Sequence, residues 1–249
     1  MITSHLVDFH CHLDLYPKHS EMVAECERRG IFTLSVTTTP LAWPENQRLA
    51  SATRHVRIAL GLHPQLVKER ATEISIWRDF LPQARYIGEV GLDAGPRFYD
   101  SFDAQKRVFE TVLRECADQG GKILTIHSVR SARTVLDMIE AYLPPSRGSF
   151  VLHWFTGNQA EADRAIRLGA YFSINAEMLR SDRHRKMIMS LPIDRVLTET
   201  DGPFTKVDNR VAEPSDVAHA VLGLAELRAM PPGELSELMV ANLKRIVSQ

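Results

Sequence analysis

The chain has 249 residues, of which 44% are hydrophobic and 24% are charged, a composition within the range of globular proteins. Its 30 Lys and Arg residues against 31 Asp and Glu residues give a net charge of -1. This balance excludes a global electrostatic footprint for nucleic acid or for an anionic membrane. Any binding of phosphate groups must therefore be local.

Three scattered cysteines, Cys11, Cys26 and Cys116, predict free thiols in a reducing compartment. The first residues show no basic segment followed by an apolar one. No apolar run approaches the roughly 20 residues that a membrane span needs. We therefore expect a cytoplasmic protein that does not contact a membrane.

Short apolar or β-branched runs recur along the whole chain and predict eight strands, separated by segments with helical spacing. The strands are expected at residues 6–10, 31–37, 56–63, 85–92, 122–127, 149–154, 170–175 and 194–200. The helices are expected at residues 20–29, 45–54, 72–80, 102–120, 130–142, 158–168, 178–190, 215–228 and 233–247. This alternation, without a low-complexity linker, predicts an α/β fold with one domain over residues 1–249.

Two parallel α/β architectures share this alternation. A doubly wound open sheet usually has a glycine-rich phosphate turn after its first strand, whereas the turn here is "CHLDLYPKH". Eight strands in about 250 residues match a (β/α)8 TIM-type barrel better, and functional residues in that fold lie at the C-terminal ends of the strands. Polar residues at those ends are therefore the candidates for a functional site.

Side chains that can bind a metal gather at the expected strand ends. Because side chains alternate along a strand, Asp8, His10 and His12 share one face, and Phe9 and Cys11 share the other. Buried imidazoles and carboxylates that converge on one mouth are costly without a cation, so we predict a site for one or two divalent metals. The candidate ligands are His10, His12, His63, Glu89, His127, His153 and Asp201.

Some of these residues have ordinary explanations when taken one at a time. A single histidine such as His63, His127 or His153 is more often a hydrogen-bonded core residue than a metal ligand. Glu89 is harder to explain structurally, because it is a carboxylate inside the apolar run "IGEVGL" with glycines on both sides. The prediction of a metal site therefore rests on the whole set. The other histidines fall in expected loops or helices and are left out.

Six motifs in chain order resemble the TatD family of metal-dependent deoxyribonucleases, which belongs to the amidohydrolase-like barrels. They are "DFHCHLD" (8–14), "GLHP" (61–64), "GEVGLD" (88–93), "IHS" (126–128), "LHWFTG" (152–157) and "TETDGPF" (198–204). The resemblance implies that His10 and His12 hold one metal with Asp201, and that Glu89 bridges two metals. It implies that His127 and His153 complete the second site.

The resemblance also assigns supporting roles. His63 would contact a substrate phosphate, and Arg130 would bind substrate. Glu199, two residues before Asp201, would orient a ligand or water. Asp8 is expected to lie deeper than His10 and to support the ligands in the same way.

Four places depart from the family pattern. Residues 94–96 replace an aromatic pair, Val129 stands where the family has an arginine, and Trp154 replaces a cysteine. Ala212 stands where the family has an asparagine. All positions of the metal ligands are retained. The altered positions are those at which the family would recognise substrate, so the departures concern the identity of the substrate and not the metal site.

The expected chemistry is hydrolysis of a phosphodiester by water activated between two divalent metals. Asp201 would take the proton and pass it to the leaving oxygen. Mixed imidazole and carboxylate ligands suit Zn²⁺ or Mn²⁺, and the family resemblance adds Mg²⁺. Near-neutral charge and a pocket at a barrel mouth favour single-stranded or frayed DNA ends as substrate.

Other functions stay open at this point. The same barrel with an HxH strand also supports an amidohydrolase acting on a small amide, a lactone or a deaminase substrate, although such binuclear sites commonly use a modified lysine as the bridging ligand. The spellings "CHLDLYP", "LSVTTTP", "LGLHPQL" and "LTETDGPF" are most similar to the TatD-like QatD nucleases of bacterial Qat anti-phage cassettes. That similarity implies a role in phage defence beside other Qat proteins, and a metal-bound subunit without catalysis is a further possibility.

Overall fold

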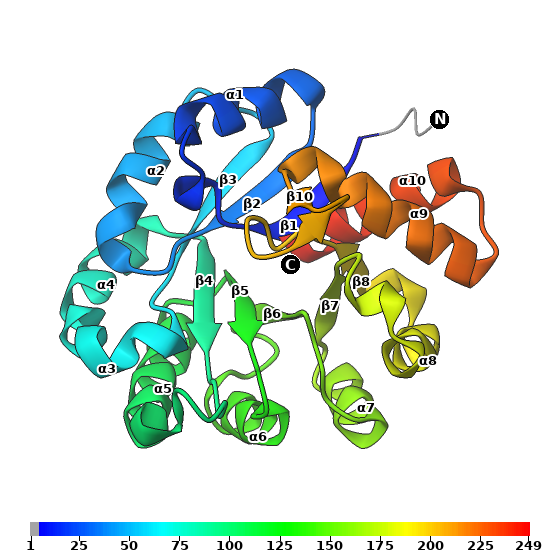
Figure 1. The fold of residues 1–249 in the computed structure, drawn as a ribbon. Helices are drawn as coiled ribbons and strands as arrows, with labels where there is room; N and C mark the ends of the chain where they lie inside the picture. Colours follow the sequence, from blue (N-terminus) through cyan, green and yellow to red (C-terminus); the bar gives the residue numbers. More distant parts are fainter. Residues whose placement is uncertain (1–4) are drawn as a thin grey trace. The chain divides into compact units, whose positions relative to one another are not determined.

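The computed structural model describes residues 5–249 (Figure 1). The expectation about the first residues rests partly on residues 1–4, which lie outside the described residues. The chain divides into two compact units. Unit 1 comprises Met1–Ser35, Glu45–Arg57 and Phe172–Ser248, and unit 2 comprises Val36–Pro44, Ile58–Tyr171 and Gln249. The single-domain organisation stays a prediction.

Unit 1 is built on parallel strands from both ends of the chain. Strand β1 (Val7–Cys11) pairs with β2 (Phe32–Val36), and β7 (Tyr171–Ile174) pairs with β8 (Val196–Thr198). Strand β8 lies beside β1, and the Thr198 hydroxyl donates a hydrogen bond to the Val7 carbonyl over 2.5 Å. Its helices are α1 (His19–Arg29), α2 (Trp43–Ala50), α8 (Asp182–Ser190), α9 (Val217–Arg228) and α10 (Pro232–Val247).

Unit 2 contains four strands in chain order. They are β3 (Val56–Leu60), β4 (Tyr86–Gly91), β5 (Lys122–His127) and β6 (Gly148–His153). Strand β4 pairs in parallel with β3 and with β5, and β5 pairs in parallel with β6. Its helices are α3 (Val67–Arg70), α4 (Ile74–Phe80), α5 (Phe102–Gln119), α6 (Ala132–Tyr142) and α7 (Gln159–Arg167). Both units therefore have the parallel strands and intervening helices that the sequence predicts.

Local sequence explains where these helices lie. In α5 the apolar residues at helical spacing, from Val108 to Cys116, are buried, and Gly120 ends the helix with its N–H bonded to the Cys116 carbonyl. In α7 the Asn158 side chain accepts from the backbone of Glu161, and the Glu161 side chain accepts from the backbone of Asn158. This capping box fixes the start of α7.

Some expected element bounds are wrong. The helix expected over 45–54 ends at Ala50, and the helix expected over 178–190 is interrupted at Ser181. The extended backbone of Ser181 lets its hydroxyl cap α8 by accepting from the His184 N–H. Strand β3 ends at Leu60, three residues before His63, so His63 lies in a loop. Strand β8 covers only part of 194–200, because Ile193–Arg195 forms a short 3-10 turn.

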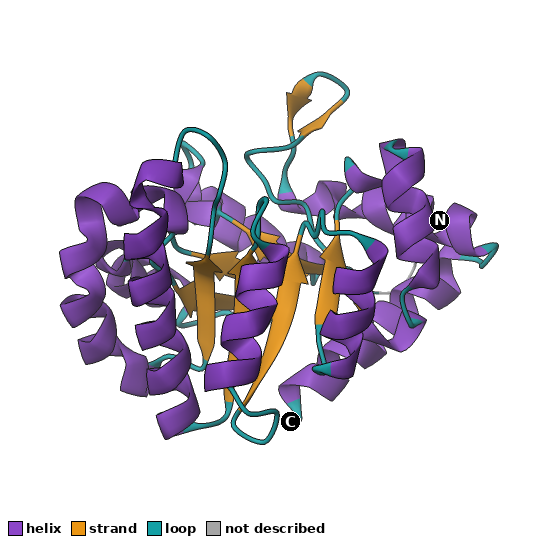
Figure 2. Cartoon of the chain, turned by 90° about the horizontal axis from the view of Figure 1, so that it is seen from below, coloured by secondary structure: helices purple, strands orange, loops and turns teal. Residues whose placement is uncertain are grey.

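Helix α3 and a small hairpin are not predicted from the sequence. Strands β9 (Lys206–Val207) and β10 (Arg210–Val211) pair antiparallel, and Figure 2 shows them as two short strands joined by a turn. The two residues between them, Asp208 and Asn209, have φ of 50° and 63°. Such a turn suits two short strands, but strands this short leave little periodic signal in a sequence.

No helix among residues 5–249 combines the length and the apolar character that crossing a bilayer requires.

Candidate metal centre

Unit 1 brings two histidines and one aspartate together at the end of strand β1. The Nε2 atoms of His10 and His12 lie 3.7 Å and 3.6 Å from Oδ1 of Asp201. One ligand atom from each residue lies within 4.8 Å of the others, and all three side chains are buried. Two imidazoles and one carboxylate at this spacing form a set of donors suited to a divalent cation.

Backbone contacts hold this first cluster in place. The His12 N–H donates to the Gly202 carbonyl over 2.8 Å, and the Asp201 N–H donates to the His10 carbonyl over 2.9 Å. Asp201 itself has a positive φ of 54°. Residues far apart in the sequence are thus tied to each other directly at the candidate ligands.

Asp8 anchors the residue next to Asp201. Its carboxylate accepts from the Thr200 N–H over 2.8 Å and from the Thr200 hydroxyl over 2.7 Å. Burial raises the pKa of Asp8 to about 8, although the bonds from Thr200 oppose this shift. The contact fits the supporting role expected of Asp8.

Glu199 is completely buried and is also held by its neighbours. The Ser173 hydroxyl and the Asn175 amide both donate to the Glu199 carboxylate, the latter over 3.0 Å. These bonds tie the carboxylate to Ser173 in strand β7 (Tyr171–Ile174) and to Asn175, which directly follows that strand. The role of Glu199 in orienting a ligand or water stays a prediction.

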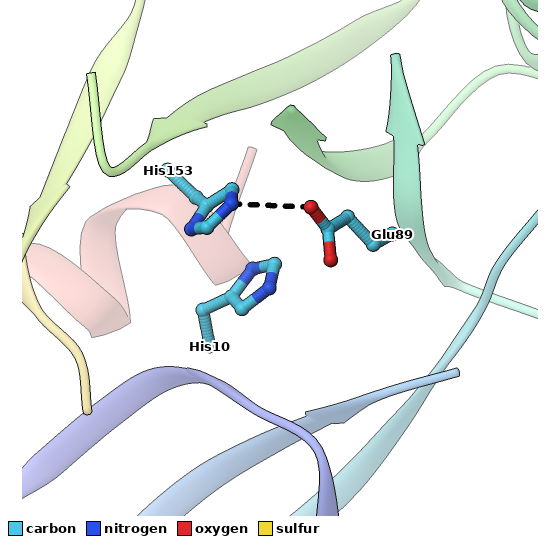
Figure 3. Close-up of side chains that lie close together, drawn as sticks. All are labelled: His10, Glu89 and His153. Atoms are coloured by element: carbon cyan, nitrogen blue, oxygen red, sulfur yellow. Dashed lines mark ion pairs between the residues drawn. The ribbon is translucent and has the colours of Figure 1, made fainter. Parts of the chain in front are cut away.

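Unit 2 forms a second cluster around one oxygen of Glu89. Oε1 lies 2.7 Å from Nδ1 of His127, 3.1 Å from Nε2 of His63 and 3.1 Å from Nε2 of His153. Figure 3 shows the Glu89 and His153 side chains facing each other. All four residues are buried. Glu89 is thus a carboxylate inside a strand whose partners come from the ends of β5 and β6 and from the loop after β3.

Glycines explain how β4 comes so close to β5. Gly91 has φ of 134°, and a Cβ atom there would lie 2.1 Å from the His127 carbonyl oxygen. Only glycine allows this approach. The glycine that follows Glu89 by two residues is therefore part of what brings Glu89 and His127 together.

A hydrogen bond to His63 indicates which of its two ring nitrogens carries the proton in the neutral form. Its Nδ1 accepts from the Gln65 N–H over 3.1 Å, so a neutral ring carries its proton on Nε2, the atom that faces Glu89. A protonated nitrogen cannot bind a cation but can donate to an anion. Although His63, Glu89 and His127 also lie close enough to hold an ion, this tautomer suits the phosphate contact expected of His63.

Asp93 is a buried residue of this cluster that the sequence analysis did not assign. Its Oδ2 lies 3.0 Å from Nε2 of His127 and accepts from the Gln65 amide over 2.8 Å. Burial alone would lower the pKa of His127, but the bonds to Asp93 and Glu89 outweigh it and raise that pKa. Asp93 ends the motif "GEVGLD", and a carboxylate directly after a strand that already carries Glu89 is the signal that could have identified it.

The donor chemistry of both clusters fits divalent cations. Each offers neutral or deprotonatable imidazoles beside a carboxylate, and a cation bound beside His127 would displace a proton from its ring. The carboxylate of Asp93 on the far side of the His127 ring is the kind of partner that orients a histidine ligand. The structure thus brings the six expected ligands into two clusters, and their roles as ligands stay predictions.

The residues at which substrate recognition is expected differ in their exposure. Arg130 is exposed, and Trp154, directly after His153, is partly exposed; both have positive φ. The Ala212 carbonyl accepts a hydrogen bond from the Tyr16 hydroxyl. A small cavity in unit 1 reaches this position; it is lined by Ala176, Glu177, Glu199, Thr200, Thr205, Lys206, Val207, Ala212 and Asp216.

Known proteins are similar to this chain in sequence. A 3'-5' ssDNA/RNA exonuclease TatD from Citrobacter rodentium is 29% identical over 242 residues, which cover 92% of this chain and 91% of the relative. The uncharacterized metal-dependent hydrolase YjjV from Escherichia coli (strain K12) is 26% identical, with 95% of both chains covered. The chain therefore matches these relatives over nearly their whole length.

A solved structure confirms the fold class. The crystal structure of the TatD homolog YjjV from Escherichia coli K12 matches 98% of this chain and 98% of its own, with a TM-score of 0.87 and 22% identity. The fold is the (β/α)8 barrel that the sequence predicts, with eight parallel strands and helices between them. Residues 7–248 match the family described as TatD related DNase, and the chain belongs to this family of hydrolases.

Proposed function

We propose that this protein is a metal-dependent nuclease that hydrolyses phosphodiester bonds at the ends of DNA, with single-stranded ends preferred. The observation that carries the proposal is the convergence of buried His10, His12 and Asp201 within ligand distance in unit 1. The relative from Citrobacter rodentium, named for 3'-5' exonuclease activity on single-stranded DNA and RNA, supports the substrate class. The net charge of -1 favours contact with few phosphates.

Under this proposal His10, His12 and Asp201 hold one divalent cation, and Glu89, His127 and His153 hold another. Divalent cations supply Lewis acidity, which makes water nucleophilic near neutral pH and neutralises charge on phosphoryl oxygens. The mixed donors favour Zn²⁺ or Mn²⁺, and Mg²⁺ is the third candidate. The bridging role implied for Glu89 stays a prediction.

The protein's own side chains then transfer the proton and bind the phosphate. Asp201 accepts the proton of the attacking water and returns it to the leaving oxygen. His63 donates from Nε2 to a phosphate oxygen, and Arg130 contacts a phosphate farther along the strand. Asp8 holds the backbone at Thr200, and Glu199 orients a ligand or water, so that the geometry is set before substrate binds.

The test uses purified protein that is stripped of metal and reloaded with Zn²⁺, Mn²⁺ or Mg²⁺ in turn. It is given DNA and RNA labelled at either end, single- and double-stranded, together with a panel of lactones, amides and nucleobase amines. The expected result is metal-dependent shortening of single-stranded DNA. Hydrolysis of the small molecules without cleavage of nucleic acid would contradict the nuclease proposal and show that the protein is an amidohydrolase.

A cytoplasmic role in phage defence beside Qat proteins is the finer part of the proposal. It is supported by the motif spellings "LSVTTTP" and "LTETDGPF". Cells that carry the full cassette are expected to lose protection when Asp201→Asn or Glu89→Ala is introduced. Full protection with either variant would instead favour a metal-bound subunit that does not catalyse.

A further inference from the structure

One large aromatic side chain is exposed at the first cluster. Phe204 is 61% exposed, although phenylalanine is usually buried in folded proteins. Its ring meets the ring of His12 at 85°, with the centroids 5.0 Å apart. The exposed ring therefore lies against a candidate metal ligand and not on a remote surface.

The backbone under Phe204 is fixed. Its N–H donates to the Asp201 carbonyl over 2.9 Å, and the next residue, Thr205, donates from its hydroxyl to the Thr200 carbonyl over 2.7 Å. The Ala212 N–H donates to the Thr205 carbonyl over 3.0 Å, which ties the far side of the β9–β10 hairpin to the same segment. The position of Phe204 is thus set by the hydrogen bonds that also hold Asp201.

We propose that Phe204 is the stacking platform for the unpaired nucleobase next to the scissile phosphate. A flat ring that presents most of its surface to solvent, held rigidly beside groups suited to a phosphate, matches how proteins bind single strands without reading their sequence. Because the ring is already in place, little conformational freedom is lost when a base stacks on it. The inference rests on the proposed nuclease function. The metal clusters account for contact with the phosphate, and Phe204 would supply the contact with the base.

An alternative role for Phe204 is to shield His12 from water without touching substrate. Phe204→Leu separates the two roles, because leucine keeps an apolar cover but has no flat π face. Phe204→Tyr keeps the face and serves as the conservative variant. Leu222→Ala, at a 46% exposed apolar residue of α9, is the control for loss of exposed apolar surface.

The first measurement uses metal-loaded protein and single-stranded oligonucleotides whose terminal nucleotides carry either a base or an abasic tetrahydrofuran. In the wild type we expect the abasic ends to raise KM about tenfold with kcat nearly unchanged, as the loss of one stacked base predicts. In Phe204→Ala and Phe204→Leu the two substrates are expected to give equal KM. Phe204→Tyr and Leu222→Ala are expected to keep the difference.

The second measurement does not depend on catalysis. Oligonucleotides with 2-aminopurine at the 5' or the 3' terminal position are titrated with metal-free protein, and quenching of the fluorescence reports stacking. We expect quenching at one end with the wild type and with Phe204→Tyr, and a loss of most of it with Phe204→Ala and Phe204→Leu. Thermal unfolding of each variant confirms that it is folded.

The outcomes of the two measurements separate the two proposals. If the wild type cleaves no nucleic acid, the nuclease proposal fails, and the fluorescence titration still decides the role of Phe204. If the wild type cleaves but Phe204→Ala and Phe204→Leu keep the preference for a terminal base, or keep the quenching, the stacking platform is overturned.

Discussion

The two clusters of candidate ligands are built in opposite ways. In unit 1 the Asp201 carboxylate lies 3.6 Å and 3.7 Å from its two imidazoles, beyond hydrogen-bond distance. In unit 2 one oxygen of Glu89 lies within 3.1 Å of three imidazoles. The first cluster is held open by backbone bonds, and the second is closed by contacts among the side chains themselves.

The difference follows from where the residues lie in the chain. His10 and His12 come from one short stretch, and only Asp201 must be supplied by another segment, the one that follows β8. The partners of Glu89 come from three separate places, so this cluster depends on the register between strands. A supporting carboxylate such as Asp93 is therefore needed in unit 2, whereas Asp8 in unit 1 acts on the backbone at Thr200.

Asp201→Asn is expected to have the largest effect of the changes that test this contrast. The variant keeps the shape of the side chain but removes the charge that attracts a cation and the base that takes a proton. We expect kcat for single-stranded DNA to fall by about 10³-fold. Kinetics on end-labelled oligonucleotides measure this, with Asp194→Asn, an exposed aspartate of the same unit, as the control. Wild-type kcat in Asp201→Asn would remove Asp201 from the chemistry.

Asp93→Asn tests whether the second cluster, in unit 2, depends on a carboxylate that orients one of its histidines. Without the Asp93 charge, His127 loses a partner that orients its ring, and metal affinity is expected to fall about 10- to 100-fold. Calorimetric titration with Zn²⁺ measures this without substrate. Asp100→Asn removes an exposed carboxylate that pairs with Lys68 and is expected to bind as the wild type does. Equal affinity in both variants would contradict a positioning role.

Gly202→Ala tests the backbone that holds the first cluster open. A Cβ atom at residue 202 would lie 2.0 Å from the Tyr16 hydroxyl and 2.8 Å from the Ala212 carbonyl oxygen. We expect the free energy of unfolding to fall by about 1–3 kcal/mol, as for other overpacked sites. Urea denaturation measures the loss. Gly233→Ala, where an added Cβ meets nothing within 4 Å, is the matched variant, and an equal effect of the two would refute the close approach.

Asp216→Asn tests the smallest expected contribution to stability, the ion pair between Asp216 and Arg210 of the β9–β10 hairpin. Arg210 reaches both carboxylate oxygens of Asp216 over 2.6 Å and 2.7 Å. Burial alone would raise the pKa of Asp216, but the bonds from Arg210 and from the Glu213 N–H outweigh it and lower that pKa. Since a lowered folded pKa stabilises the protein only while the group is charged, the contribution is present above about pH 4 and is lost as the pH falls further.

The expected cost of Asp216→Asn is about 1 kcal/mol at pH 7, because Arg210 is half exposed and water screens the pair. Urea denaturation at pH 7 and at pH 3 checks this, and the difference from the wild type should shrink at pH 3. Arg210→Met is expected to show the same dependence on pH. A cost that stays constant between the two pH values would show that packing, and not charge, is lost.

Alternation along strands and the order of the motifs determined the fold class and the candidate ligands of this protein. HxH on one strand and a carboxylate between glycines are local patterns, so they are visible without a structure. The register between strands decided which residues meet: it placed Asp93 behind His127 and it brought Nε2 of His63 to Glu89. Phe204 over His12 also depends on tertiary structure, because the two residues lie far apart in the sequence and only the packing of β8 beside β1 brings them together.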